Sequence, residues 1–434
     1  MPNIVKHKIV RTALNELPLM TVVTWVRFIA FRFMGSGNNS FSKNMMRLAI
    51  SAVSLSVATM ILTIATVKGF QNGIRDKVVK IHGSYIVDHA ANVEGAEPLV
   101  ISSMYLPEFM QKGSNSKELK NMGVSRAAIS ASKACIVKGE DDLDGMIAKG
   151  MELGDFNFGM GEFVIKSCRE PIAGTWVYIS QSLSDRLKLD TGDALTLVFF
   201  VNDSSGNGRP RAARPIIAGI FETGIEQIDN QVIYTGLDLV QKYTEVKPGF
   251  TQIELWESNN GSLNPMEVAK QLDPGILRIS DSKQFHRQIY DWLAILNTNV
   301  WVILILMAVV AIIAMSTILL ILMVEKTSFV GIAQAMGSPI SQIQKIFLWQ
   351  SAIIVFFGVV IGDVIAVALC WIQDKYHYLT LNQDVYFVKY VMVDLEPMSV
   401  IWVNIGVVLA SVLAALLPVQ WIKRMTPSRA IRFQ

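Results

Sequence analysis

The side chains that most often carry out hydrolysis are scattered along this chain and form none of the common catalytic motifs. The five histidines include no H-E-x-x-H zinc motif, and no G-x-S-x-G sequence presents a nucleophilic serine. A G-x-x-x-x-G-K-[ST] loop, which would hold nucleotide phosphates, is also absent from the sequence. We therefore expect no catalytic residue, no bound metal and no cofactor. Any ATP that drives this protein must be bound by a partner.

The three cysteines have no metal-binding or redox spacing. Cys370 lies in an apolar run, where we expect it to pack as an inert thiol. Cys135 and Cys168 could form a disulfide in an oxidising compartment, or both could remain free thiols. The sequence leaves these two alternatives open.

Asp363 is a carboxylate in the middle of an apolar run, a position that costs about 2.5–3.5 kcal/mol on membrane-insertion scales. Such a group normally faces protein or water, and Lys68 and Asn404 are its two candidate partners. We expect a structural partnership, with a functional role as the alternative. Gly358 and Gly362 precede it as a G-x-x-x-G pair, which permits close packing of another helix, within one protomer or in a dimer.

The elements that would position these residues are long apolar segments. Hydrophobic residues make up 51% of the 434-residue chain and charged residues only 17%, whereas soluble domains carry about 25% charged residues. The net charge of +3 provides no basic field for nucleic acid. Four windows reach the roughly 20 residues that are needed to cross a bilayer. These predicted transmembrane helices are residues 48–68, 300–324, 347–372 and 398–421.

Lysine and arginine residues cluster before the first span and after the last, which by the positive-inside rule places both termini in the cytoplasm. Residues 1–47 then form a cytoplasmic N-terminal region, and residues 422–434 form a cytoplasmic tail. The apolar stretch Leu17–Met34 contains two arginines and is predicted to lie as an interfacial helix on the inner leaflet, or alternatively to pack on protein. Residues 69–299 and the short loop 373–397 would face the periplasm.

The large outer segment has the short alternating runs of an α+β domain. Ser180 is placed to cap a short helix whose Leu183 faces inward. The chain then forms a strand at Ala194–Val201 and returns as a second strand at Ile216–Phe221, which predicts a hairpin with the long tip Asn202–Arg211. The expected fold is a membrane protein with four transmembrane α-helices and a large α+β extracytoplasmic domain between the first and second helices.

The cytoplasmic link between the second and third spans, residues 325–346, carries a series of helix signals. A helix can continue to Met336 and end at Gly337, because glycine readily adopts the left-handed conformation that terminates helices. Ser338 as N-cap and Pro339 at the first helical position then begin another helix. We expect a short, stiff elbow, with a simple connector as the alternative.

The sequence of this elbow resembles the coupling region of FtsX/MacB-type ABC permeases, roughly E-K/R-x-x-x-I-G-I-x-x-A-x-G-A-x-x-x-x-I-x-x-I-F. Val330 and Ile346 match this pattern, and Ser338 replaces its usual alanine. The resemblance implies that the elbow contacts a partner ATPase. The residues to which it assigns this coupling are Glu325, Lys326, Gly331, Ile332, Ala335, Gly337, Ile343 and Phe347.

Further stretches are similar to the lipoprotein-releasing (Lol) permeases of the same superfamily. Phe28–Met34 and Lys68–Lys77 resemble their beginning, and Met425–Arg432 resembles their ending. Gly219–Gly224 with Asp229 resembles part of their outer domain. The resemblance covers nearly the whole chain and implies a permease subunit of the bacterial inner membrane.

The resemblance also implies partners and binding sites. The partners are a LolD-like ATPase dimer that binds ATP, a second permease protomer (a copy or a relative), lipoprotein cargo of unspecified identity, membrane lipids and a LolA-like periplasmic carrier. The lipoprotein's acyl chains would lie between the first span of one protomer and the second span of the other. Candidates for the walls of that cavity are Met60, Ile64, Val67, Trp301, Ile305, Ala308 and Ile312. Candidates for recruiting the carrier are Asn202, Arg209 and Arg211.

Two other functions stay open on the sequence. A MacB-like mechanotransmission permease would act on other periplasmic cargo, and an FtsX-like protein would regulate cell-wall hydrolases. MacB carries a fused ATPase, for which this sequence has no phosphate loop, and the outer domains of FtsX proteins are smaller. Co-purification of an ATPase and of lipoproteins would separate these alternatives.

Overall fold

The computed structural model of the chain describes residues 40–93, 97–107, 110, 117–139, 143–168, 176–202, 208–244, 246–258, 263–381 and 388–421. The predicted interfacial helix and the cytoplasmic tail lie outside these residues. The chain divides into two compact units, which we call the helical unit and the sheet unit. The helical unit comprises Met1–Phe70, Ala294–Leu379 and Val391–Gln434, and the sheet unit comprises Gln71–Leu293 and Thr380–Tyr390.

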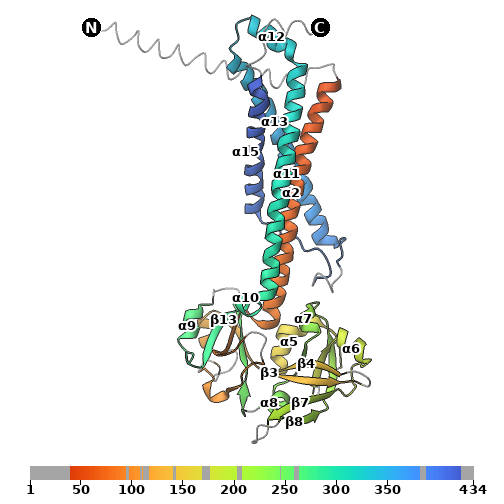
Figure 1. Ribbon diagram of the computed structural model, residues 1–434, viewed down its shortest axis with the longest axis vertical. Helices are drawn as coiled ribbons and strands as arrows, with labels where there is room; N and C mark the ends of the chain where they lie inside the picture. Colours follow the sequence, from red (N-terminus) through yellow and green to blue (C-terminus); the bar gives the residue numbers. More distant parts are fainter. Residues whose placement is uncertain are drawn as a thin grey trace, which may run out of the picture. The chain divides into compact units, whose positions relative to one another are not determined.

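Four helices in the described part of the chain are long and apolar enough to cross a membrane (Figure 1). They are α2 (Ser40–His82), α11 (Arg287–Glu325), α13 (Ile340–Tyr376) and α15 (Pro397–Trp421). Each contains one of the predicted spans, and the large domain follows the first helix, as expected. The 39 residues of α11 would extend about 58 Å, roughly twice the 30 Å thickness of a bilayer core. Long helices of this kind must therefore continue beyond the membrane.

The four long helices pack against one another in the helical unit through two buried apolar clusters. One cluster contains Ala49 of α2, Ile354 of α13 and Ala414 of α15. The other contains Val57, Ala366 and Val403 of the same three helices. A Cβ at Gly358 would lie 2.6 Å from Val53 Cγ1, and one at Gly362 would lie 2.8 Å from the Ser54 carbonyl oxygen. The G-x-x-x-G pair therefore brings α13 close to α2 within one protomer.

Asp363 has one of its two predicted partners. The Asn404 side-chain amide donates a hydrogen bond of 2.9 Å to Asp363 Oδ2, so that prediction is confirmed. The prediction that Lys68 pairs with Asp363 is wrong. Lys68 instead forms an ion pair with Glu396 and donates a 2.8 Å hydrogen bond to Ser399. Because Lys68 and Glu396 are both about half exposed, this pair requires less desolvation than a pair with a carboxylate in mid-helix.

The sheet unit is built on an eleven-stranded mixed sheet (Figure 1). Its main path runs in the order β13, β1, β12, β3, β4, β10, β6, β9 and β5, while β7 pairs with β3 and with β8. The strands of this sheet are β1 Tyr85–His89, β3 Val124–Lys138, β4 Leu143–Met151, β5 Val164–Ser167, β6 Trp176–Ser180, β7 Thr196–Asn202, β8 Gly208–Ala213, β9 Ile216–Phe221, β10 Val232–Gly236, β12 Gln252–Glu257 and β13 Leu277–Asp281. Ile101–Ser102 (β2) and Gly249–Phe250 (β11) form a separate two-stranded sheet.

Short helices and two apolar cores complete the sheet unit. One core packs α6 and α8 on the strands around β4 and β10, and the other packs α4 and α9 on the strands around β12. The helical turns are η1 Ser103–Tyr105, α4 Lys117–Asn121, α5 Leu153–Met160, η2 Gly161–Phe163, α6 Gln181–Leu187, α7 Glu226–Asp229, α8 Leu237–Gln241, α9 Pro265–Ala269 and α10 Ser282–Phe285. The predicted cap of α6 is confirmed, because Ser180 Oγ accepts a 3.2 Å bond from the Leu183 amide and Leu183 is fully buried.

The predicted hairpin partner is wrong. Strand β7 pairs with β8, while Ile216–Phe221 pairs in parallel with β6 and antiparallel with β5. The sequence Gly208–Ala213 reads as a loop because it contains Pro210 and two arginines. Such residues are typical of an edge strand, and among the described strands β8 pairs with β7 alone.

All three cysteines are free thiols, so Cys135 and Cys168 do not pair. Cys135 is buried in the core between β3 and β4, and burial raises the pKa of its thiol to about 12. It therefore stays protonated at neutral pH and is chemically inert.

Candidate functional site

The elbow between α11 and α13 is a short helix closed by a hydrogen-bonded turn. Helix α12 covers Thr327–Ala335, and Gly337 follows it with φ +88°. The Gly337 amide donates to the Gln334 carbonyl at 3.0 Å, and the Ser338 amide donates to the Ala333 carbonyl at 2.9 Å. This pair of bonds is the Schellman arrangement that ends many helices. The predicted break at Gly337 is confirmed, one residue after the helix cap at Met336.

The start of α13 differs from the prediction by one residue. Pro339, in an extended conformation, is the N-cap, and Ile340 is the first helical residue. The prediction that Ser338 caps this helix is wrong, because the helix begins one residue later than predicted. The two helices are therefore joined without a flexible residue between the turn and the cap.

One side of the elbow is a packed core. Ile343 and Phe347 of α13 are buried against Val330 and Ala333 of α12 and against Met323 of α11. Gly331 is also buried. These contacts fix the orientation of α12 relative to the helices that carry it. A force applied to α12 would therefore move α11 and α13 rather than bend the link.

Glu325 and Lys326 hold the junction where α11 ends. Their side chains form an ion pair at 3.2 Å and are only 17% and 24% exposed. Thr327 Oγ1 donates to carbonyl oxygens in the last turn of α11. Glu325 and Lys326 therefore shape the bend between α11 and α12.

The other side of the elbow is apolar and exposed. Ile332, Met336 and Ile340 expose 53%, 75% and 37% of their surfaces, and Ala335 and Gly337 are exposed beside them. We call these five residues the elbow tip. Of the predicted coupling residues, only Ile332, Ala335 and Gly337 belong to it. Sequence reasoning missed Met336 and Ile340; the available signal was their position on either side of the turn at Gly337.

The candidate walls of the lipid cavity fall into three groups by exposure. Met60 is only 4% exposed and packs with Val403 and Ala366 inside the helical unit. Trp301 and Ile305, by contrast, expose 66% and 61% of their surfaces. The remaining candidates are partly buried, namely Ile64, Val67, Ala308 and Ile312. Helix α11 therefore exposes an apolar surface near Trp301, whereas Met60 serves packing within one protomer.

The candidate carrier residues lie on the β7–β8 hairpin. Asn202 is opposite Gly208, and Arg209 is opposite Val201. Arg209 and Arg211 are both exposed on the edge strand β8. The tip itself, residues 203–207, lies outside the described residues.

The Gly219–Asp229 stretch, which resembles Lol outer domains, forms a buried turn. The Asp229 carboxylate accepts bonds from the Thr223 amide at 3.1 Å, the Thr223 hydroxyl at 2.7 Å and the Gly224 amide at 2.8 Å. Burial raises the pKa of Asp229, although these hydrogen bonds oppose the shift. A Cβ at Gly219 would lie 2.4 Å from the Tyr178 ring. This motif therefore maintains the fold.

Comparisons with known proteins agree with this architecture. A family model described as FtsX-like permease C-terminal matches residues 301–427, which include the elbow. The lipoprotein-releasing system transmembrane protein LolC of Xylella fastidiosa is 21% identical over 420 residues, covering 91% of this chain and 95% of that protein. LolE of Haemophilus influenzae is 21% identical over 427 residues, covering 93% and 98%.

Among solved structures, the periplasmic region of MacB from Actinobacillus actinomycetemcomitans aligns with 50% of this chain and 98% of its own, at 12% identity and a TM-score of 0.32. The similarity to lipoprotein-releasing permeases, which extends over more than nine-tenths of the chain, confirms the resemblance found in the sequence. The described part of the chain also contains four helices that are long and apolar enough to cross a membrane, as a multi-pass permease requires.

Proposed function

We propose that this chain is the permease subunit of an ATP-driven complex that releases lipoproteins from the cytoplasmic membrane to a periplasmic carrier. The elbow tip is the observation that carries the proposal. An exposed apolar surface on a stiff turn suits docking of another protein. Relatives of similar length are named as lipoprotein-releasing proteins.

In this proposal a LolD-like ATPase dimer binds the elbow tip from the cytoplasm and supplies the energy of ATP. Closure of the ATPase moves α12, and the buried contacts of the elbow pass that movement to α11 and α13. Extracting an acyl chain from a bilayer costs about 0.8 kcal/mol per CH₂. Release therefore needs an external energy source.

The remaining partners follow from the same proposal. The second protomer is a copy or a relative of this chain, and the acyl chains lie against the exposed face of α11 around Trp301 and Ile305. Arg209 and Arg211 on β8 offer positive charge to an acidic face of a LolA-like carrier. Both termini lie in the cytoplasm of a bacterium, and the sheet unit lies in the periplasm.

The test is a charge placed on the elbow tip. Ala335→Glu should abolish stimulation of the ATPase while membrane insertion is unchanged, because a carboxylate would be desolvated against an apolar partner. Ala194→Glu is the matched control, since Ala194 is an exposed alanine of the sheet unit. If Ala335→Glu still couples ATP hydrolysis to release, the elbow is only a connector and the proposal fails.

A further inference from the structure

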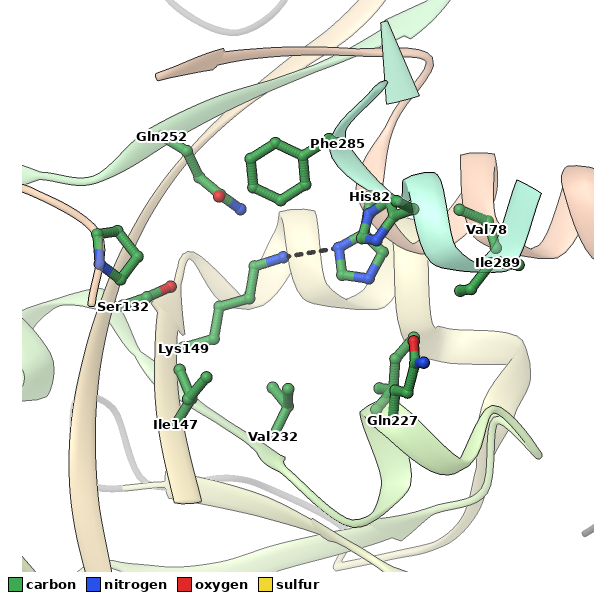
Figure 2. A pocket seen from close by; sticks show the side chains of 13 residues that line it. Val78, His82, Ser132, Ile147, Lys149, Gln227, Val232, Gln252, Phe285 and Ile289 are labelled. Atoms are coloured by element: carbon green, nitrogen blue, oxygen red, sulfur yellow. Dashed lines mark hydrogen bonds between the residues drawn. The ribbon is translucent and has the colours of Figure 1, made fainter. Parts of the chain in front are cut away.

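The sheet unit contains a cavity of about 230 Å³ that the proposed function does not use (Figure 2). Helix α2 contributes Val78 and α11 contributes Ile289 to its wall. Strands β4 and β10 contribute Ile147 and Val232. The surface of the cavity is thus largely apolar, although polar residues also line it, and the cavity lies where α2 ends and α11 begins.

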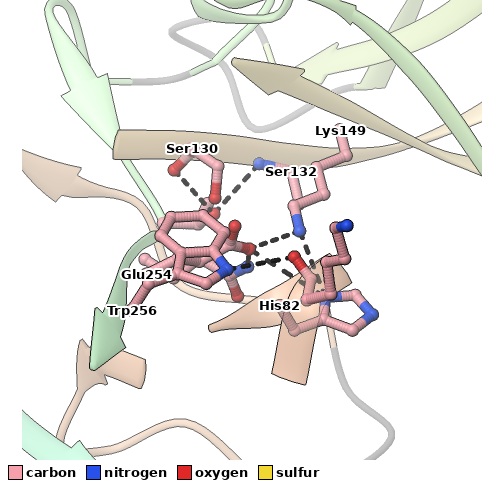
Figure 3. Close-up of polar contacts among 9 residues, drawn as sticks. His82, Ser130, Ser132, Lys149, Glu254 and Trp256 are labelled. Atoms are coloured by element: carbon pink, nitrogen blue, oxygen red, sulfur yellow. Dashed lines mark hydrogen bonds and ion pairs between the residues drawn. The ribbon is translucent and has the colours of Figure 1, made fainter. Parts of the chain in front are cut away.

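Polar groups meet at one side of this cavity. Lys149 is only 3% exposed and forms an ion pair with the fully buried carboxylate of Glu254 (Figure 3). The Lys149 ammonium also lies 3.3 Å from His82 Nδ1. An ammonium group can only donate hydrogen bonds, so Nδ1 must accept. His82 is therefore a neutral imidazole whose proton is on Nε2.

Several donors of this cluster lack an acceptor. His82 Nε2 is buried and has no hydrogen-bond partner within the described residues, and the same is true of His286 Nε2. The two imidazole rings contact each other at a tilt of 37° with centroids 4.4 Å apart, and both residues line the cavity. Lys149 uses two of its three N–H groups, on Glu254 and His82. A buried donor without a partner is unfavourable. His82 Nε2 therefore lacks a hydrogen-bond acceptor, and the unpartnered oxygen Glu254 Oε2 belongs to a residue that does not line the cavity.

The charge of the cluster is already balanced. Glu254 neutralises Lys149, and Gln252 donates a further 2.8 Å bond to the same carboxylate oxygen. Glu254 itself does not line the cavity. An anionic ligand would therefore bring an uncompensated charge into a largely apolar site, and a cationic ligand would lie against the Lys149 ammonium. An uncharged ligand with an acceptor atom avoids both costs.

We propose that this cavity binds a small uncharged amphiphile whose apolar body lies against Val78, Ile147 and Val232 and whose carbonyl or hydroxyl oxygen accepts from His82 Nε2 and Lys149. A cavity of about 150 Å³ holds benzene. By that standard a space of 230 Å³ accommodates roughly ten non-hydrogen atoms. The bound molecule would contact α2, α11 and the sheet together. The site requires neither an ATPase nor a lipoprotein, so its test is independent of the proposed function.

The experiment uses the full chain in lipid nanodiscs and 8-fluorooctanamide, observed by ¹⁹F NMR. Empty nanodiscs give the contribution of partitioning into lipid. We expect saturable binding at one site, and at least tenfold weaker binding of fluorooctane, which has no acceptor, and of 8-fluorooctanoate, which is charged.

Two variants localise the binding. Val232→Phe should fill the cavity and weaken binding at least tenfold, whereas Val246→Phe, at an exposed valine outside the cavity, should leave it unchanged. His82→Phe removes the orphan donor but leaves Lys149, so it should weaken binding of 8-fluorooctanamide severalfold and leave that of fluorooctane unchanged. Thermal unfolding of each variant verifies that it is folded. Absence of saturable binding, equal binding by Val232→Phe, or tighter binding of the octanoate would overturn the proposal.

Discussion

Single residues set how closely the helices of the helical unit approach one another. At Gly362 an added Cβ would lie 2.8 Å from the Ser54 carbonyl oxygen, whereas at Gly406 it would meet no atom within 4 Å. The contact at Gly362 is with the backbone of α2, which cannot move without displacing α2 from α13. The two glycines therefore have opposite tolerance for a methyl group, although both lie in long apolar helices.

We expect Gly362→Ala to destabilise the protein by about 1–3 kcal/mol, the usual cost of overpacking. Gly406→Ala should be neutral or stabilising by up to about 1 kcal/mol, because alanine is the better helix former. Thermal unfolding in nanodiscs measures both effects. Equal midpoints for the two variants would show that the close approach of α13 to α2 is absent.

A second residue-scale prediction concerns His286. Burial, with the nearby ammonium of Lys149, lowers the pKa of His286 to about 4. In the unfolded chain its pKa is about 6.5, so the unfolded state takes up a proton first as the pH falls. The sheet unit should therefore lose up to about 3 kcal/mol of stability between pH 6.5 and pH 4 through this residue.

The measurement is hydrogen exchange of the β12 amides as a function of pH, compared between the native chain and His286→Phe. Burial raises the pKa of Glu254, and such carboxylates change stability with pH in the opposite sense to His286. Both chains contain these carboxylates, so the difference between the native chain and His286→Phe isolates the contribution of His286. His377→Phe, at an exposed histidine, is the control. A pH-independent difference would contradict the assignment.

At the scale of elements, the elbow depends on a turn that only some residues can form. Gly337 has φ +88°, and its amide and that of Ser338 close the turn. A Cβ at this position would meet no atom, so the restriction is one of backbone conformation and not of space. The turn that joins α12 to α13 therefore requires a left-handed residue at position 337.

Gly337→Ala should cost about 1–2 kcal/mol, the penalty for a left-handed L-residue, while Gly337→Asn should be tolerated better. Faster hydrogen exchange of the Gly337 and Ser338 amides in the elbow would report loosening of the turn. ATPase stimulation should fall in the same order, with alanine lower than asparagine. Indistinguishable alanine and asparagine variants would mean that the left-handed turn is not what couples the helices.

Local signals made some elements predictable and left others hidden. The apolar windows, the Ser180 cap and the break at Gly337 are encoded within a few residues. Strand β8 was missed because Pro210 and its arginines suit an edge strand as well as a loop. The pair of Lys149 and Glu254 joins strands that are 105 residues apart. The sequence shows neither residue to be buried, so the polar cluster required the fold.

At the scale of the whole molecule, we assign separate roles to the helical unit and the sheet unit. The helical unit provides four membrane-crossing helices and the elbow tip, and the sheet unit provides a large domain with a cavity of its own. Neither role needs a catalytic residue in this chain. In the proposed function, a partner therefore supplies the energy by hydrolysing ATP, and this chain uses it to release lipoprotein from the membrane.

Release of a lipoprotein from proteoliposomes tests this claim most directly. The vesicles contain the chain with its co-purifying ATPase, and a soluble carrier is added outside. We predict that lipoprotein moves to the soluble fraction only when ATP, ATPase and carrier are all present, and that Ala335→Glu abolishes the transfer while Ala194→Glu does not. ATP hydrolysis by the chain alone, or a complete assembly that hydrolyses ATP without releasing lipoprotein, would contradict the account.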